Sequence, residues 1–183
     1  RTLLTTNELL AERGETDMMK ANNVLVQKLI DRMASMTSQL KTFAYNKPQR
    51  LQAISLTSAL EETLRVYQSQ LNKVDVRVRV PRNLNKIMGE EQRLLQVLGN
   101  LVSNALDAMG NTTNPQLNLI VNPTANQVEL KVSDNGCGVS DEMLESMFEP
   151  FQTSKKIGEG LGLGLAITAN NMRDMNGQVT AVS

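Results

Sequence analysis

The chain has 183 residues, with 19 Lys and Arg against 19 Asp and Glu, no histidine and one cysteine. This length suits one large domain, or one domain with an appendage, and 40% hydrophobic residues can form a core. Zero net charge argues against a nucleic-acid-binding protein.

The missing histidine excludes Ser-His-Asp or Cys-His catalysis and His-ligated metals within the chain. A lone cysteine excludes an internal disulfide or a cysteine-cluster zinc site. Apolar runs are too short to span a membrane, and we expect a cytosolic fragment of a longer protein because the sequence begins at Arg1 without an initiator Met.

Residues 1–46 are predicted to form a partial helical hairpin. A first helix over residues 1–13 ends at Gly14, and a second begins near Thr16. Apolar residues of the second helix recur at heptad spacing, as expected for coiled coils and four-helix bundles; these are Val26, Leu29, Met33, Met36, Leu40 and Phe43. An amphipathic helix packed on a globular core is the alternative. A single hairpin cannot bury both of its faces, so we expect a homodimer formed through this hairpin.

A break at Pro48 and a linker over residues 47–55 separate the hairpin from a domain over residues 56–183. Helices are predicted over 56–71, 90–109 and 163–175, and strands over 74–80, 116–121 and 127–132, with a further strand beginning over 179–182 whose partner is incomplete. The strand at 74–80 has a basic outer face, which either solvates or contacts an acidic partner. The predicted fold class is α+β: a two-layer sandwich of a mixed β-sheet with helices on one face, preceded by the helical hairpin.

The predicted helix over 90–109 is apolar over most of its surface but carries one polar seam. The seam consists of Arg93, Gln96, Asn100, Asn104 and Asp107, which fall within about 40° of one line on a helix. A buried polar seam is costly without partners, so it faces either water or a ligand. Two Asn residues one turn apart favour the ligand, because amide oxygens suit Mg²⁺, which uses few protein groups and keeps waters and phosphate oxygens.

Two glycine-rich segments follow in the sequence. In the first, Asp134 ends a predicted strand and precedes Gly136 and Gly138. This pattern suits a plain turn, or a carboxylate that accepts a hydrogen bond from a ligand amine such as that of adenine.

The second glycine-rich segment, residues 158–164, has glycine at every other position and leads into a predicted helix. Backbone N–H groups at such a helix start can bind phosphate. Residues 148–156, with two Phe around a Pro and then Thr-Ser-Lys-Lys, predict a mobile lid over the phosphates, and a flexible linker is the alternative.

In this order, these segments resemble the ATP-binding domain shared by sensor histidine kinases, DNA gyrase B subunits, Hsp90 chaperones and MutL. Residues 100–105 resemble the N box, 134–138 and 160–165 the two glycine boxes, and 148–151 the Phe box. The gyrase-like and chaperone members are similar in carrying a catalytic Glu where this chain has Asn100, so the resemblance points to a histidine kinase. The sequence at 104–108, and residues 32–44 of the second hairpin helix, look most like the nitrogen-sensor and C4-dicarboxylate-sensor branch.

The resemblance implies ATP and Mg²⁺ as cofactors. By this likeness Asn104 ligates Mg²⁺ and Asn100 supports the metal or its water shell, and these two are the catalytic residues. Asp134 binds the adenine amine. The other cofactor-binding residues that the resemblance implies are Asp107, Gly136, Gly138, Lys155, Gly160, Gly162, Leu163 and Gly164.

The resemblance also implies that the γ-phosphoryl group passes to a histidine upstream of Arg1, and then to an Asp of a response-regulator receiver domain. It implies the cytoplasmic part of a protein of the bacterial inner membrane, with C4-dicarboxylate as the stimulus and no nucleic-acid partner. Two alternatives remain: an anti-sigma-type kinase or ATPase on the same fold, and a non-catalytic nucleotide-binding scaffold. The hairpin argues against the first, and the intact glycine boxes argue against a loss of ATP binding.

Overall fold

The computed structural model describes residues 17–44, 50–153 and 161–183. The chain divides into two compact units, Arg1–Tyr45 and Asn46–Ser183, which are described separately. The helix predicted over residues 1–13 lies outside the described residues. None of the helices in the described part is both long enough and apolar enough to cross a membrane.

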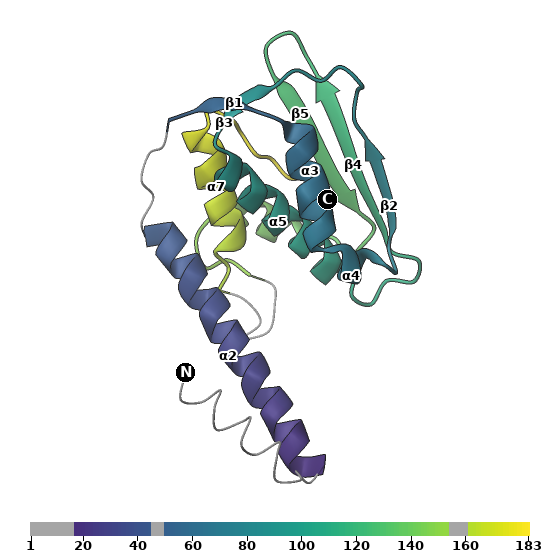
Figure 1. Ribbon diagram of the computed structural model, residues 1–183, viewed down its shortest axis with the longest axis vertical. Helices are drawn as coiled ribbons and strands as arrows, with labels where there is room; N and C mark the ends of the chain where they lie inside the picture. Colours follow the sequence, from purple (N-terminus) through teal and green to yellow (C-terminus); the bar gives the residue numbers. More distant parts are fainter. Residues whose placement is uncertain (1–16, 45–49, 154–160) are drawn as a thin grey trace. The chain divides into compact units, whose positions relative to one another are not determined.

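The first unit contains helix α2, Asp17–Ala44, at the place of the predicted second hairpin helix (Figure 1). Four members of the heptad seam leave much of their surface exposed: Val26 at 42%, Leu29 at 49%, Met33 at 68% and Leu40 at 51%. The side chains of Met36 and Phe43 lie outside the described set. Because exposing apolar side chains is unfavourable, this seam is available for packing against another surface.

The second unit is built on a mixed three-stranded sheet with the order β2-β4-β5. Strand β2, Asp75–Arg79, pairs in parallel with β4, Gln116–Pro123, and β4 pairs antiparallel with β5, Val128–Asp134. Leu117, Leu119 and Val121 alternate along β4 and are buried, so one face of the sheet forms the core. The mixed sheet predicted from the sequence is thereby confirmed.

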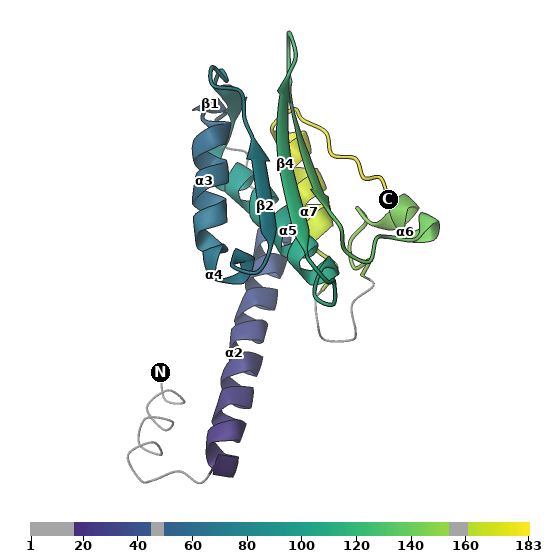
Figure 2. The ribbon, with the colours of Figure 1, turned by 90° about the vertical axis from the view of Figure 1, so that its right-hand side faces the viewer.

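Helices α3 (Leu56–Val66), α5 (Glu91–Ala108) and α7 (Gly164–Asp174) lie on one side of the sheet, as Figures 1 and 2 show. Leu60 of α3, Leu98 of α5 and Leu119 of β4 belong to one buried cluster, and Val102 and Leu117 belong to a second. The predicted two-layer α+β sandwich is therefore correct. Helix α5 is the central helix of the layer, because it packs against both α3 and α7.

The single helix predicted over residues 56–71 is instead two helices, α3 and the short α4, Gln68–Leu71. Helix α3 begins where the Ser55 hydroxyl accepts a hydrogen bond of 3.2 Å from the Ser58 N–H. It ends at Tyr67, whose φ of −91° and ψ of 7° lie outside the helical region and whose N–H bonds to the carbonyls of Arg65 and Thr63. The helical path therefore breaks at Tyr67.

A second, two-stranded sheet was not predicted. Strand β1, Gln52–Ile54, pairs antiparallel with β3, Ile87–Gly89. The prediction of a linker over residues 47–55 is therefore wrong in its last part. The pairing needs a close approach, because a Cβ added to Gly89 would lie 2.8 Å from Cδ1 of Ile54. Both strands have three residues, too few for alternation to be recognised in the sequence.

Two further differences concern the end of the chain. Helix α6, Asp141–Ser146, was not predicted, although Ser140 caps it by accepting a 3.3 Å hydrogen bond from the Met143 N–H. The strand predicted over 179–182 is wrong: these residues are not in a strand, and no segment of the described residues pairs with them. Alternating Val residues do not form a strand without a hydrogen-bonded neighbour.

Candidate functional site

Helix α5 carries the candidate site on its polar side. It is apolar on the sides that face α3 and the sheet. Leu94, Leu98, Val102 and Ala105 are buried there. The polar seam of the same helix must therefore lie on a different side. Its five members do not share one environment.

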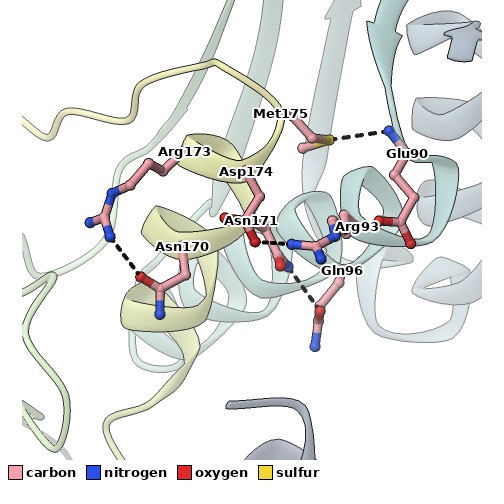
Figure 3. A network of polar contacts seen from close by, with 8 residues as sticks. All are labelled: Glu90, Arg93, Gln96, Asn170, Asn171, Arg173, Asp174 and Met175. Carbon is pink, nitrogen blue, oxygen red and sulfur yellow. Dashed lines mark hydrogen bonds and ion pairs between the residues drawn. The ribbon is translucent and has the colours of Figure 1, made fainter. Parts of the chain in front are cut away.

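The first two members of the seam, Arg93 and Gln96, face helix α7, not water or an open ligand site as the sequence suggested. Arg93 is buried and forms ion pairs with Glu90 of the turn before α5 and with Asp174 of α7 (Figure 3). Gln96 accepts a 2.9 Å hydrogen bond from the buried Asn171 of α7. The expectation missed this arrangement because periodicity shows which side chains share a line, but not which element covers that line.

Asn100 marks the point where α7 begins against α5. Its Nδ2 donates to the carbonyl oxygen of Gly164 at 2.9 Å and to the hydroxyl oxygen of Thr168 at 3.2 Å. Thr168 is fully buried, and its hydroxyl donates to the same Gly164 carbonyl at 2.9 Å. Gly164, the last residue of the second glycine-rich segment, is thereby fixed on α5 at Asn100. Thr168 was not singled out in the sequence, where a Thr within a helix gives no signal.

The backbone before α7 has a conformation that requires glycine. Gly162 has φ of +65°, and a Cβ there would lie 2.6 Å from the carbonyl oxygen of Gln152. The Phe151 N–H donates to the Gly162 carbonyl at 3.0 Å, so the Phe box meets the second glycine box. Leu163, the N-cap of α7, makes no side-chain cap hydrogen bond. The first N–H groups of α7 therefore have no side-chain cap, as an anion-binding helix start requires.

The first glycine-rich segment is fixed at the other end of α5. Strand β5 ends at Asp134, whose Oδ1 accepts a 2.8 Å hydrogen bond from the Gly136 N–H in a tight turn. A Cβ on Gly136 would lie 2.6 Å from the carbonyl carbon of Ala108, and the Cys137 N–H donates to the Ala108 carbonyl at 3.2 Å. Gly138 has φ of +70°. Asp134 itself is exposed at the edge of the sheet.

Asn135 holds this turn in place, and sequence reasoning did not assign it a role. Its Oδ1 accepts a 2.7 Å hydrogen bond from the Gln116 N–H, and its Nδ2 donates to the Asn114 carbonyl at 3.1 Å. The side chain thus joins the turn after β5 to the loop before β4. Asn is a frequent turn residue because its side chain bonds nearby backbone, and that was the available signal.

Asn104 lies midway between the two fixed points. It is half-buried and lies four residues after Asn100 and four before Ala108. Residues four apart on a helix are about 40° apart around the axis and about 6 Å apart along it, so the three share a face. The structure therefore brings Asn104 between the two glycine-rich segments. Two other predicted site residues, Lys155 and Gly160, lie outside the described residues.

Asp107 lies near the side of α5 that faces Tyr67. Burial raises the pKa of the Tyr67 hydroxyl above its ordinary value of 10.0, a hydrogen bond with Ser103 opposes this, and the negative charge of Asp107 adds to the rise in pKa. Asp107 is exposed. A role for Asp107 in nucleotide binding stays a prediction.

The donor set fits a magnesium ion that arrives with a nucleotide. Among the residues that the structure describes, no group of three or more acidic, Cys or His side chains could hold a metal ion. Asn100 and Asn104 lie one turn apart, and Asn100 uses its amide nitrogen on α7, which leaves its oxygen as the remaining polar atom. Mg²⁺ commonly takes one or two protein oxygens and completes its shell with waters and phosphate oxygens.

The known family with this arrangement is that of histidine kinase-, DNA gyrase B- and HSP90-like ATPases, which matches residues 89–183. That range is slightly more than half of the 183 residues and contains α5 and both glycine-rich segments. The chain belongs to this family. The resemblance stated from the four sequence boxes is confirmed.

Curated relatives of this chain include sensor kinases. The C4-dicarboxylate transport sensor protein DctB of Pseudomonas aeruginosa is 34% identical over 174 residues, which cover 93% of this chain and 28% of DctB. The sensory histidine kinase/phosphatase NtrB of Rhizobium leguminosarum is 29% identical over 171 residues, which cover 85% of this chain and 45% of NtrB. The chain thus spans less than half the length of either relative.

Solved structures agree with this family. The nucleotide-free catalytic domain of histidine kinase ThkA is 25% identical, with a TM-score of 0.62 over 69% of this chain and 82% of that domain. The crystal structure of ThkA in complex with the response regulator protein TrrA gives a TM-score of 0.72 at 19% identity, covering 95% of this chain and 51% of that chain. At 19% identity the second likeness shows the fold alone.

Proposed function

We propose that this chain is the ATP-binding part of a sensor histidine kinase, and that it binds Mg²⁺-ATP for phosphoryl transfer to a histidine. One observation carries the proposal: both glycine-rich segments are fixed on helix α5, one at Asn100 and the other at Ala108, with Asn104 between them. The phosphate-binding and adenine-binding segments thereby flank a single amide side chain. The sensor-kinase names of DctB and NtrB support the kinase reading over the ATPase and scaffold alternatives.

In this proposal Asp134 recognises the adenine amine. Its Oδ1 is occupied by the Gly136 N–H, which fixes the carboxylate and leaves Oδ2 as an acceptor for the amine. A carboxylate that already accepts a backbone hydrogen bond has a defined direction, which favours selection of an amine over a carbonyl. Gly136 and Gly138 permit the close turn in which this occurs.

The phosphates are proposed to bind at the start of α7. The uncapped N–H groups of Gly164 and the following residues, together with the helix dipole, favour negative charge there. The backbone of Gly162 and Leu163 forms the approach to this position. Gly160 and Lys155, which lie outside the described residues, are proposed to contribute as predicted from the sequence.

Asn104 is the proposed protein ligand of Mg²⁺, and Asn100 is proposed to support the metal or its water shell. When bound, Mg²⁺ neutralises charge on the phosphates. Asn100 also donates to the Gly164 carbonyl, so it positions the phosphate-binding helix relative to Asn104. These two amides and the α7 start suit a reaction that depends mainly on positioning and charge.

The proposed acceptor is a histidine on a dimerisation hairpin outside these 183 residues, which contain no histidine. A bond forms between the histidine nitrogen and the γ-phosphorus while the bond from that phosphorus to the β,γ-bridging oxygen breaks, which releases ADP. The ThkA–TrrA complex supports a response regulator as the next partner. An Asp of its receiver domain would accept the phosphoryl group.

The exposed heptad seam of α2 supports the proposal of a homodimer through the helical hairpin. We also propose a cytoplasmic position for this part, in a protein whose other regions lie in the bacterial inner membrane. C4-dicarboxylate as the stimulus stays a prediction, since the match covers only 28% of DctB.

Isothermal calorimetry of this chain with Mg²⁺-ATP tests the proposal. Asp134→Asn and Asn104→Ala are each expected to weaken binding by at least about tenfold, because each removes a charged or metal-binding contact. Asp75→Asn and Asn122→Ala are matched controls, since both residues are exposed on the sheet and the residues that they contact, Arg77 and Glu129, lie there too. Unchanged affinity in both site variants would reject the site, and an absence of Mg²⁺-ATP binding by the parent chain would reject the proposed function.

A further inference from the structure

Helices α5 and α7 are joined by a ladder of polar contacts that no sequence box contains as a whole. Its rungs connect Arg93 with Asp174, Gln96 with Asn171, and Asn100 with the Gly164 carbonyl. Figure 3 shows the first two rungs, with the α5 side chains pointing toward α7. As the residue number rises along α5, the residue number of the partner falls along α7. The ladder therefore runs the full length of α7, from its last residue to its first.

The rung at Arg93 has the strongest electrostatic character. Arg93 and Glu90 are each only 7% exposed, and the Arg93 guanidinium is shared between Glu90 and Asp174. Asp174 is the last residue of α7, where the helix dipole disfavours a negative charge. A carboxylate at that place is therefore stabilised by Arg93 and not by its own helix. The planar guanidinium carries its donors in a rigid fork and can bridge two carboxylates in a defined geometry.

The same end of α7 is also held by Met175, the residue that follows Asp174. The Sδ atom of Met175 accepts a 3.5 Å hydrogen bond from the Glu90 N–H, and a Cβ on Gly89 would lie 3.3 Å from that sulfur. The C-terminal end of α7 is thus fixed where β3 passes into α5. The other end, Gly164, lies about 15 Å away along the helix at 1.5 Å per residue.

We propose that Arg93 is a positioning residue of the nucleotide site: through Asp174 it sets the register of α7 on α5. The inference rests on the proposed function, because its consequence is the place of the α7 start relative to Asn100 and Asn104. A helix moves nearly as a rigid rod, so a shift of one residue at Asp174 moves Gly164 by about 1.5 Å. That distance is enough to misplace hydrogen-bond donors to phosphate.

The test varies Asp174, which at 39% side-chain exposure tolerates change better than the buried Arg93. Asp174→Asn removes the charge that Arg93 binds, Asp174→Glu keeps a carboxylate, and Arg173→Gln is the control on the exposed side of the same helix end, where Arg173 contacts Asn170. Two readouts are taken: the amide ¹H–¹⁵N shifts of Gly162 and Gly164 without nucleotide, and the calorimetric Kd for Mg²⁺-ATP.

For Asp174→Asn we expect displaced Gly164 amide signals and at least about fivefold weaker Mg²⁺-ATP binding, with recovery toward the parent value in Asp174→Glu and no change in Arg173→Gln. A lower melting temperature with an unchanged Kd and unchanged glycine signals would overturn the inference, because the ladder would then only hold the fold. If the parent chain does not bind Mg²⁺-ATP, the proposed function fails, while the glycine signals still decide whether Asp174 controls the α7 register.

Discussion

The side-chain amide of Asn100 donates a 2.9 Å hydrogen bond to the backbone carbonyl of Gly164, a residue 64 positions later in the chain. This bond joins the first residue of the N box to the first residue of α7. Asn100 therefore has a structural role in addition to the metal-supporting role proposed for it. The two roles use different atoms, since the nitrogen contacts α7 and the oxygen remains for a ligand.

Asn100→Asp separates these roles because it keeps the shape of the side chain and removes both N–H donors. A carboxylate would then face the Gly164 carbonyl and lose the 3.2 Å contact with Thr168. We expect a loss of about 1–3 kcal/mol in the free energy of unfolding, measured by urea denaturation. Asn85→Asp, an exposed position, is the matched control with an expected change within about 0.5 kcal/mol. Equal effects in the two variants would show that the contact with Gly164 contributes nothing.

Gly162 and Gly164 give opposite predictions for the same substitution. Gly162→Ala places a Cβ 2.6 Å from backbone at φ of +65°, so we expect destabilisation of about 1–3 kcal/mol. At Gly164 a Cβ would meet Asn100 only at 3.8 Å, and Ala favours a helix by up to about 1 kcal/mol over Gly. Gly164→Ala should therefore fold normally by thermal denaturation, and any loss of Mg²⁺-ATP affinity in it reports a ligand beside α7. Full retention of affinity would argue against a close approach of the ligand to the Cα of Gly164, because Ala keeps the backbone N–H.

The elements that sequence patterns predict well are those that bury one clear face. The helix at 90–109 and the strands at 116–121 and 127–132 were predicted within a few residues, because apolar spacing alone determines which face is buried. The three-residue strands β1 and β3 form only because distant segments pair across the fold, which no local pattern contains. Helix α6 had a readable signal in Ser140 followed by two acidic residues, and it was missed.

The candidate site was predictable in its residue types but not in its partners. The polar seam of α5 was expected to meet water or a ligand, yet Arg93 and Gln96 meet α7. Spacing shows that these side chains share a line, while their partners on α7 are 81 and 75 positions away in the sequence. Asn135 and Thr168 act through hydrogen bonds to backbone atoms, and such contacts leave little trace in a single sequence.

The raised pKa of the Tyr67 hydroxyl predicts that the free energy of unfolding falls at alkaline pH. Burial raises the pKa of this hydroxyl above 10.0, and the charge of Asp107 acts in the same direction. Above the unfolded pKa the unfolded chain loses this proton first and so binds fewer protons than the folded chain. Stability is therefore fully present below about pH 10 and falls as the pH rises through the folded pKa.

Urea denaturation between about pH 9 and 11.5 should thus give a steeper decline for the parent chain than for Tyr67→Phe. The variant also loses the hydrogen bond with Ser103, which lowers its stability at every pH and does not affect the slope. Lysines titrate in the same range in both proteins, so the difference between the two curves isolates Tyr67. Parallel curves would mean that the hydroxyl ionises equally in the folded and unfolded chain.

The absence of histidine predicts the chemical outcome of incubating this chain with ATP labelled at the γ-phosphate. A phosphohistidine has an acid-labile P–N bond, whereas a phosphoserine ester survives acid, so acid treatment before counting distinguishes the two products. With no histidine among the 183 residues, we expect Mg²⁺-ATP binding but no acid-labile label on the chain. The matched control is Asn104→Ala, which should bind weakly and also remain unlabelled.

An acid-labile label on the parent chain would contradict the proposal that a histidine is the acceptor. Rapid phosphate release that Asn104→Ala abolishes would favour the ATPase alternative, because water would then accept the phosphoryl group without a protein acceptor.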